Sequence, residues 1–181
     1  MGKLILNVDC DGVLYDTISV ALELMRELGC DMTNKYEIDY YFKNIIDWNE
    51  LFKRASVINS GIEKVKILKN GDYFDEVNIV TGICSSNNEE RIKREIFHAQ
   101  LPDIKVITVQ YGIPKALVVP HPESSIFVDD EKRNCINIKK YGGMPILFTR
   151  DKMDVNHDII NDILAVPYTK SYKKLIKTRY F

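Results

Sequence analysis

Short apolar runs that alternate with helical patterns constrain the fold of this chain more than any other feature. The expected elements are strands at 3–8, 77–80, 106–109, 125–128 and 145–148, and helices at 91–97 and 132–141. Strands that alternate with helices usually join into a parallel sheet with helices on both faces. Ligands of such α/β sheets bind in the crevice at the carboxyl ends of the strands. The pattern therefore predicts an α/β fold with its chemistry at that edge.

The segment between the first two strands reads as helical. Asp16-Thr17 can cap a helix that stops at Gly29, and no strand is evident between residues 30 and 71. Further helix starts are expected at Thr33, at Asp47 with Glu50 in a capping-box pattern, and at Asn59. The predicted domains are therefore a core of residues 1–16 and 75–181 and a helical insertion of residues 17–74. The last thirty residues are expected to form a peripheral helix with a basic, solvated face, formed by Lys170, Lys173, Lys174, Lys177 and Arg179.

Composition narrows the class of partner. The 181 residues suffice for one domain with a small insertion, and a net charge of -1 argues against broad affinity for nucleic acid or anionic membranes. No apolar run approaches the roughly 18 residues that a membrane helix needs. We expect a cytoplasmic protein that binds any phosphate group locally.

The cysteines and histidines predict neither disulfides nor zinc. The four cysteines are scattered without a C-x-x-C pair, and there are only three histidines. Cys10 and Cys84 stand beside candidate site residues, but a free cysteine usually behaves as a small buried hydrophobe. We therefore assign them no catalytic role.

Two pairs of aspartates follow expected strands. Asp9 and Asp11 stand two residues apart, so that both carboxylates can emerge on one side of an extended chain. Asp129 and Asp130 follow the run 125–128. Converged carboxylates repel one another unless a hard cation binds among them or some stay protonated, and oxygen ligands favour Mg²⁺. Either pair alone would also fit an ordinary Asp-rich turn.

A calcium loop does not fit the first pair. Such a loop requires an acid or Asn at its fifth position and Gly at its sixth, where this chain has Val13 and Leu14.

Two further positions can contribute to phosphate binding. Thr81-Gly82 follows an expected strand, so a hydroxyl and turn amides can meet a phosphate there, and Lys115 adds a positive charge. A plain turn and a surface lysine are the alternatives for these residues.

Taken in order, Asp9-Cys10-Asp11-Gly12, Thr81-Gly82, Lys115 and Asp129-Asp130 resemble the four motifs of the haloacid dehalogenase-like (HAD) hydrolases. The resemblance covers residues 3 to about 149. It implies a Rossmann-like three-layer core with a parallel sheet and a small helical cap inserted after the first motif. The presence of a second acid, Asp11, two residues after Asp9 is similar to the pattern of the phosphatase branch of this superfamily.

The resemblance also implies roles for these residues. Asp9 would attack phosphorus to form an aspartyl-phosphate, and Asp11 would protonate the leaving alcohol and then activate water. Mg²⁺ would be bound by Asp9, by the backbone carbonyl of Asp11 and by one of Asp129 and Asp130, with Asp130 favoured as the direct ligand. The implied phosphate cradle is Thr81, Gly82 and Lys115.

The segment from Val106 to Asp130 is similar to the 5′(3′)-deoxyribonucleotidases, whose cap aromatics stack on the base. Here the corresponding wall would come from Tyr41, Phe42 and Trp48, unless these residues form the core of the cap. Ile83 after Gly82 and Glu131 after the acidic pair depart from the pattern usual in those enzymes.

The resulting hypothesis is a Mg²⁺-dependent phosphomonoesterase that acts on a nucleoside monophosphate. A polynucleotide 3′-phosphatase, another small-molecule HAD phosphatase and a non-catalytic nucleotide-binding or phosphate-binding module are the alternatives. The expected partner is a small phosphate ester and neither a membrane nor a polynucleotide, and a homodimer is compatible with the sequence.

Overall fold

The computed structural model describes residues 4–84 and 88–148 and contains a five-stranded parallel sheet. Its strand order is β3-β2-β1-β4-β5, so the first strand of the chain lies at the centre. The strands are β1 (Ile5–Val8), β2 (Glu76–Ile83), β3 (Lys105–Gln110), β4 (Ser125–Asp129) and β5 (Met144–Leu147). All five predicted strands are therefore present.

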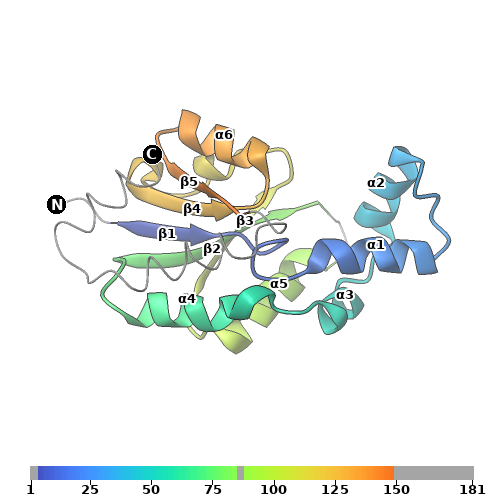
Figure 1. Cartoon of the computed structure of the whole chain (residues 1–181), viewed down its shortest axis with the longest axis horizontal. Helices are drawn as coiled ribbons and strands as arrows, with labels where there is room; N and C mark the ends of the chain where they lie inside the picture. Colours follow the sequence, from blue (N-terminus) through green and yellow to red (C-terminus); the bar gives the residue numbers. More distant parts are fainter. Residues whose placement is uncertain (1–3, 85–87, 149–181) are drawn as a thin grey trace.

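Helices cover both faces of this sheet. In Figure 1, α6 (Lys132–Lys140) lies above the strands, whereas α4 (Gly61–Asn70) and α5 (Glu89–Gln100) lie below them. The helix α4 packs against β2, α5 against β3, and α6 against β4 and β5. These are the three layers of the predicted Rossmann-like α/β fold.

Three helices extend past the carboxyl ends of the central strands (Figure 1). They are α1 (Thr17–Glu27), α2 (Lys35–Asn44) and α3 (Trp48–Arg54). Their first turns are capped locally, because the Asp16 carboxylate accepts from the amide of Ser19 and the Asp47 carboxylate from the amide of Asn49. No residue of α2 is buried, so this helix lies at the periphery of the fold.

Several predicted boundaries shift by one or two residues. Asn34, rather than Thr33, caps α2, since its side chain accepts from the amides of Tyr36 and Glu37. The helix α4 begins at Gly61, two residues after the predicted start at Asn59 and directly after the short 3₁₀ turn η1 (Ile58–Ser60), and it ends at Asn70. The predicted C-terminal helix and its basic face lie outside the described residues.

The strand β2 is longer than predicted. The sequence places a turn at Thr81-Gly82, but both residues lie inside β2, which continues to Ile83. The reason is tertiary, because Thr81 and Gly82 pair in register with Thr108 and Val109 of β3.

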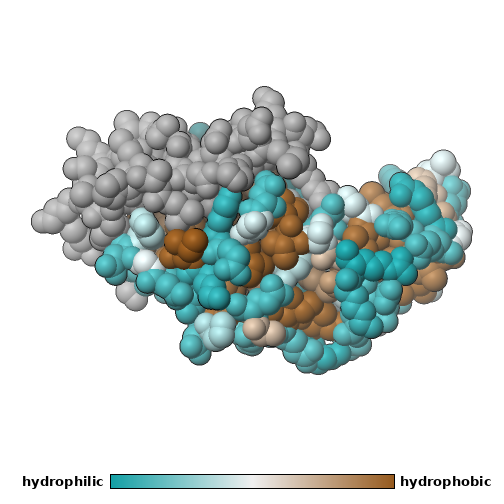
Figure 2. Space-filling view, turned by 60° about the horizontal axis from the view of Figure 1, so that its bottom comes forward, coloured by the Kyte–Doolittle hydropathy of each residue, from teal (hydrophilic) through white to brown (hydrophobic). Residues whose placement is uncertain are grey.

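The outer surface is mixed in character. The face in Figure 2 is mostly hydrophilic, with apolar side chains gathered between the polar ones. Among the residues that the structure describes, no helix combines the length and the apolar character needed to cross a membrane.

Candidate active site

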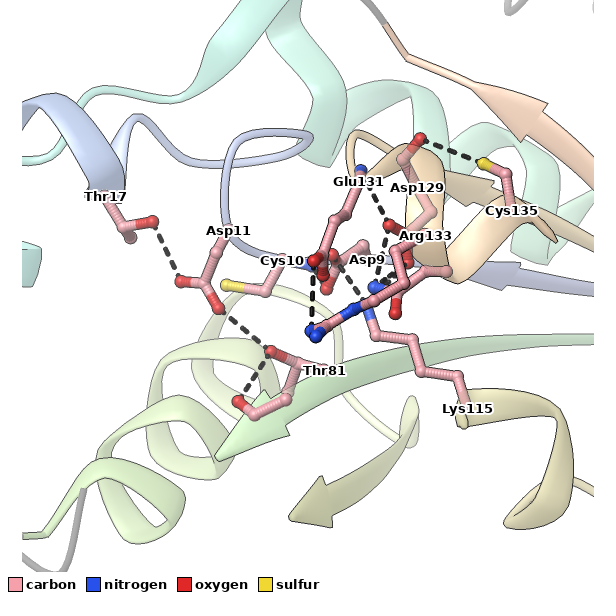
Figure 3. A network of polar contacts seen from close by, with 12 residues as sticks. Asp9, Cys10, Asp11, Thr17, Thr81, Lys115, Asp129, Glu131, Arg133 and Cys135 are labelled. Carbon is pink, nitrogen blue, oxygen red and sulfur yellow. Dashed lines mark hydrogen bonds and ion pairs between the residues drawn. The ribbon is translucent and has the colours of Figure 1, made fainter. Parts of the chain in front are cut away.

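Two of the predicted aspartates meet at the end of the central strands. Asp9 directly follows β1 and Asp129 ends β4, and the two strands pair so that Val8 lies opposite Val128. Lys115, in the 3₁₀ turn η2 (Lys115–Leu117), places its Nζ 2.6 Å from Asp9 Oδ2 and 2.7 Å from Asp129 Oδ2 (Figure 3). All three side chains are buried. The parallel register thus brings together residues that lie more than one hundred positions apart.

Asp129 is held by further donors. Its Oδ1 accepts from the amide of Glu131 at 2.9 Å and from the Asn134 amide group at 3.0 Å. Asn134 is a site residue that the sequence analysis did not identify. With Lys115 on Oδ2, both oxygens of Asp129 have protein donors.

Asp130 points toward the turn that follows β1. Gly12 in that turn has a φ of +73°, and a Cβ atom placed there would lie 2.1 Å from Asp130 Oδ2. One oxygen each from Asp9, Asp129 and Asp130 lies within 4.8 Å of the other two. A set of carboxylate oxygens at this spacing fits a hard divalent cation.

Burial and mutual repulsion shape the charges of this cluster. Burial, partly opposed by Lys115, raises the pKa of Asp9 to about 8, with added repulsion from Asp129 and Asp11. Burial and the charge of Asp129 raise the pKa of Asp130 to about 6. Three carboxylates thus share one ammonium group, and an additional positive charge would stabilise their ionised forms.

Asp11 lies on the opposite side of the site from Lys115. Its Oδ1 accepts from Thr17 Oγ1 at 2.8 Å, and its Oδ2 accepts from Thr81 Oγ1 at 3.2 Å (Figure 3) and from Lys93 Nζ at 2.6 Å. Burial alone would raise the pKa of Asp11, but the Lys93 ammonium group outweighs it and holds this pKa below its ordinary value.

Lys93 is a second site residue that the sequence analysis missed. It belongs to α5 and forms an i,i+4 ion pair with Glu89. Two other pairs on the same helix, Arg91 with Glu95 and Glu90 with Arg94, have the same spacing but lie at the surface. The spacing therefore does not separate the buried pair from ordinary surface pairs.

A cavity of about 490 Å³ opens above these groups. The core contributes Asp9, Asp11, Gly82, Cys84, Glu89, Tyr111, Lys115, Asp130, Glu131 and Asn134 to its lining. The helices α1 and α2 contribute Thr17, Ile18, Lys35, Ile38, Asp39, Phe42 and Lys43. Catalytic candidates and a partly apolar wall thus face one space.

The three aromatic candidates divide between the cavity and the protein core. Phe42 lines the cavity, whereas Trp48 is only 1% exposed and lies outside its lining. The Trp48 ring packs edge-on against Phe42, with centroids 5.6 Å apart, and it also packs against Phe52. Tyr41 donates its hydroxyl to the Leu28 carbonyl at 3.4 Å. The structure therefore places Trp48 in the core that supports Phe42.

The predicted phosphate cradle is only partly assembled around this space. Lys115 and Gly82 line the cavity, whereas Thr81 is fully buried and directs its hydroxyl to Asp11. Cys84 also lines the cavity, and burial and the neighbouring Glu89 raise the pKa of its thiol to about 12.

Comparison with solved structures gives the fold family. A HAD-superfamily hydrolase of subfamily IA, variant 1, from Geobacter sulfurreducens matches with a TM-score of 0.55 and 17% identity, over 88% of this chain and 99% of that one. The chain has the fold of the HAD hydrolases. A HAD hydrolase of family IA, variant 3, from Entamoeba histolytica matches with a TM-score of 0.52 and 14% identity, over 97% of this chain and 100% of that one.

A hydrolase from Pseudomonas syringae also matches this HAD fold, with a TM-score of 0.53 and 12% identity, over 92% of this chain and 100% of that one. No protein-family model matches the sequence, and no curated protein does. The comparisons therefore establish the fold, and the chemistry has to be argued from the site.

Proposed function

We propose that this protein is a Mg²⁺-dependent phosphomonoesterase that hydrolyses a nucleoside monophosphate through an aspartyl-phosphate. The observation that carries the proposal is the buried Asp9 carboxylate, which lies against Lys115 at the cavity and has a second carboxylate, Asp11, two residues away. A purely binding site would gain little from such costly burial of acids where an anion must enter.

In the proposed reaction, Asp9 attacks phosphorus and the ester oxygen departs with a proton from Asp11. Water then attacks the phosphorus of the aspartyl-phosphate, gives its proton to Asp11, and releases phosphate and free Asp9. Asp11 must carry a proton in the first step, and a phosphate dianion bound beside it favours that form. Lys115 stabilises the charge that develops on the phosphoryl oxygens.

The proposed metal site consists of Asp9, Asp130 and the backbone carbonyl of Asp11. The donor set fits, because it offers oxygen ligands from a cluster in which Asp9, Asp129 and Asp130 share the single ammonium group of Lys115. Bound Mg²⁺ would offset the repulsion between the nucleophile and the phosphate. Asp129 accepts from Lys115, from Asn134 and from the Glu131 amide, so we assign Asp129 to the orientation of Lys115.

The helices past the strand ends form the proposed cap, within residues 17–74. Phe42 on α2 contributes an apolar ring to the cavity wall, and Tyr111 of the core lines the same cavity. Aromatic rings of this kind stack on nucleobases. This is the support for a nucleotide rather than a smaller ester.

The test of the proposal is phosphate release from 5′ and 3′ mononucleotides, a sugar phosphate, p-nitrophenyl phosphate and a 3′-phosphorylated oligonucleotide, with Mg²⁺ and with chelator. We expect chelator-sensitive turnover that is fastest with a mononucleotide. Turnover confined to the sugar phosphate or to the oligonucleotide would retain the chemistry and refute the substrate. Inactivity toward every ester would refute the proposed function.

Replacing Phe42 by Ala should raise the KM for the mononucleotide by about tenfold, because stacking contributes about 1–3 kcal/mol per base. The KM for p-nitrophenyl phosphate should change less. Tyr36→Ala is the matched control, since Tyr36 lies on the same helix but is 76% exposed and lies outside the cavity lining. Equal effects on both substrates would assign Phe42 to cap packing.

Asp130→Asn should weaken Mg²⁺ binding more than Asp129→Asn does, because protein donors hold Asp129 beside Lys115, whereas Asp130 is the proposed direct ligand. Isothermal titration with Mg²⁺ measures the order directly. The reverse order would exchange the roles of the two residues.

The raised pKa of Asp9 predicts a pH dependence of stability in the presence of chelator. Because its folded-state pKa of about 8 exceeds the ordinary 3.8, the folded protein holds the extra proton between pH 4 and 8. The contribution to stability is therefore complete below pH 4 and is lost as the pH rises toward 8. In urea unfolding, the free energy of unfolding should fall more steeply with rising pH for the wild type than for Asp9→Asn. Added Mg²⁺ should reduce this fall. If the stability of the two proteins changed with pH in the same way, the raised pKa of Asp9 would be contradicted.

A further inference from the structure

Lys93 makes a set of contacts that the proposed chemistry does not use. Besides Asp11, its Nζ lies 2.7 Å from Glu89 Oε1, 2.9 Å from the Gly82 carbonyl and 3.2 Å from Thr81 Oγ1. The side chain is 1% exposed. An ammonium group this deeply buried needs oxygen partners on several sides, and these contacts provide them.

Glu89 anchors this lysine to the end of β2. Its side chain is also 1% exposed, and its second oxygen accepts from the backbone amide of Cys84 at 2.9 Å. The ammonium group of Lys93 is therefore fixed from the helix side by Glu89 and from the strand side by the Gly82 carbonyl.

An aromatic ring covers the same ammonium group. Lys93 Nζ lies 4.8 Å from the centroid of the Trp48 ring, and α3 packs against α5. This cation–π contact connects α3, a helix of the proposed cap, to the carboxylate network. It also gives Trp48 a place in the site that differs from the stacking role expected from the sequence.

Burial of an ion pair carries a large desolvation cost, and well-packed apolar residues in its place often stabilise a protein as much as the pair does. Stability alone thus does not explain why Lys93 is buried against Glu89 and Asp11. Its geometry acts on Asp11, because Thr17 holds one carboxylate oxygen and Lys93 holds the other, together with Thr81. These donors on both oxygens restrict the rotation of the Asp11 carboxylate.

We propose that Lys93, anchored by Glu89, is a positioning residue that holds the Asp11 carboxylate in the orientation required for proton transfer to the leaving oxygen and, later, from the attacking water. The inference rests on the proposed function of Asp11 as acid and base. A misplacement of about 1 Å in a catalytic group can cost about 100-fold in rate.

The test compares two leaving groups. A nucleoside departs as an alkoxide unless it receives a proton, whereas p-nitrophenolate departs readily without one. Lys93→Met should therefore lower kcat/KM for the mononucleotide by about 100-fold and for p-nitrophenyl phosphate by less than about tenfold. Because kcat/KM ends at the first irreversible step, slow hydrolysis of the aspartyl-phosphate does not obscure the comparison.

Two further variants keep the test decisive. Arg91→Met, which removes a surface cation from the same helix, should leave both values unchanged. If Lys93→Met fails to fold, Glu89→Gln carries the test, because it loosens the anchor while keeping the lysine, and it should show the same selective loss.

Equal losses on both substrates, or none, in a folded variant would refute the positioning role. A wild-type protein that is inactive toward both esters would instead refute the proposed function itself. The two failures are therefore distinguishable.

Discussion

Asp9→Asn should lower phosphate release by more than about 10³-fold, because the amide cannot act as the nucleophile that forms the acyl phosphate. The substitution preserves shape, and an amide oxygen can still accept from Lys115, which lies 2.6 Å from the native carboxylate. Asn is also neutral, and burial, which raises the pKa of Asp9, disfavours the charged form of the native carboxylate. We therefore expect a folded protein with no activity.

The measurement is steady-state phosphate release together with mass spectrometry of rapidly quenched wild-type and variant protein. Only the wild type should gain the mass of one phosphoryl group during turnover, on the peptide that contains Asp9. Asp103→Asn, at an exposed turn, is the control for the chemistry of the substitution. Phosphorylated Asp9→Asn protein, or a variant that retains activity, would show that another group is the nucleophile.

The strands and helix caps could be predicted because their signals are local. Apolar runs ending in polar residues mark β1 and β4, and Asp16 and Asp47 cap the helices that follow them. The end of β2 could not be predicted, because Gly82 resembles a turn residue and is kept in the strand by its pairing with Val109. Such pairing is a tertiary contact that local composition does not encode.

The site could be predicted where acids follow strands, since the carboxyl ends of parallel strands meet at one edge. Lys93 could not be predicted, because it reaches Asp11 from a helix and its spacing to Glu89 matches that of the neighbouring surface pairs. Asn134 likewise resembles any polar residue of α6 until the register places it beside Asp129.

The aromatic residues show a different limit. Phe42 and Trp48 are six positions apart in a segment that was expected to be helical, and either residue could have faced a ligand. Their positions follow from packing, because α3 packs against α5 and buries the Trp48 ring, whereas α2 stays peripheral and directs Phe42 into the cavity. Helical periodicity predicts faces of a helix but not which neighbour each face meets.

Gly12→Ala should lower both Mg²⁺ affinity and turnover by at least about 100-fold. The new Cβ would lie 2.1 Å from Asp130 Oδ2 and 2.8 Å from its Cγ, so the carboxylate proposed as a direct metal ligand must move. The positive φ of +73° adds backbone strain of about 1–2 kcal/mol for a residue other than glycine. A displaced ligand weakens binding of Mg²⁺, which requires near-ideal octahedral geometry.

Gly29→Ala separates the two causes. Gly29 has a comparable φ of +83°, but a Cβ there would meet nothing within 4 Å. Both variants should lose similar stability in thermal unfolding with chelator, whereas only Gly12→Ala should lose Mg²⁺ binding in a calorimetric titration. If both variants bound Mg²⁺ as tightly as the wild type, Asp130 would not be a direct ligand. Equal losses of binding would instead assign the effect to backbone strain, since a Cβ at Gly12 would clash with Asp130 but a Cβ at Gly29 would not.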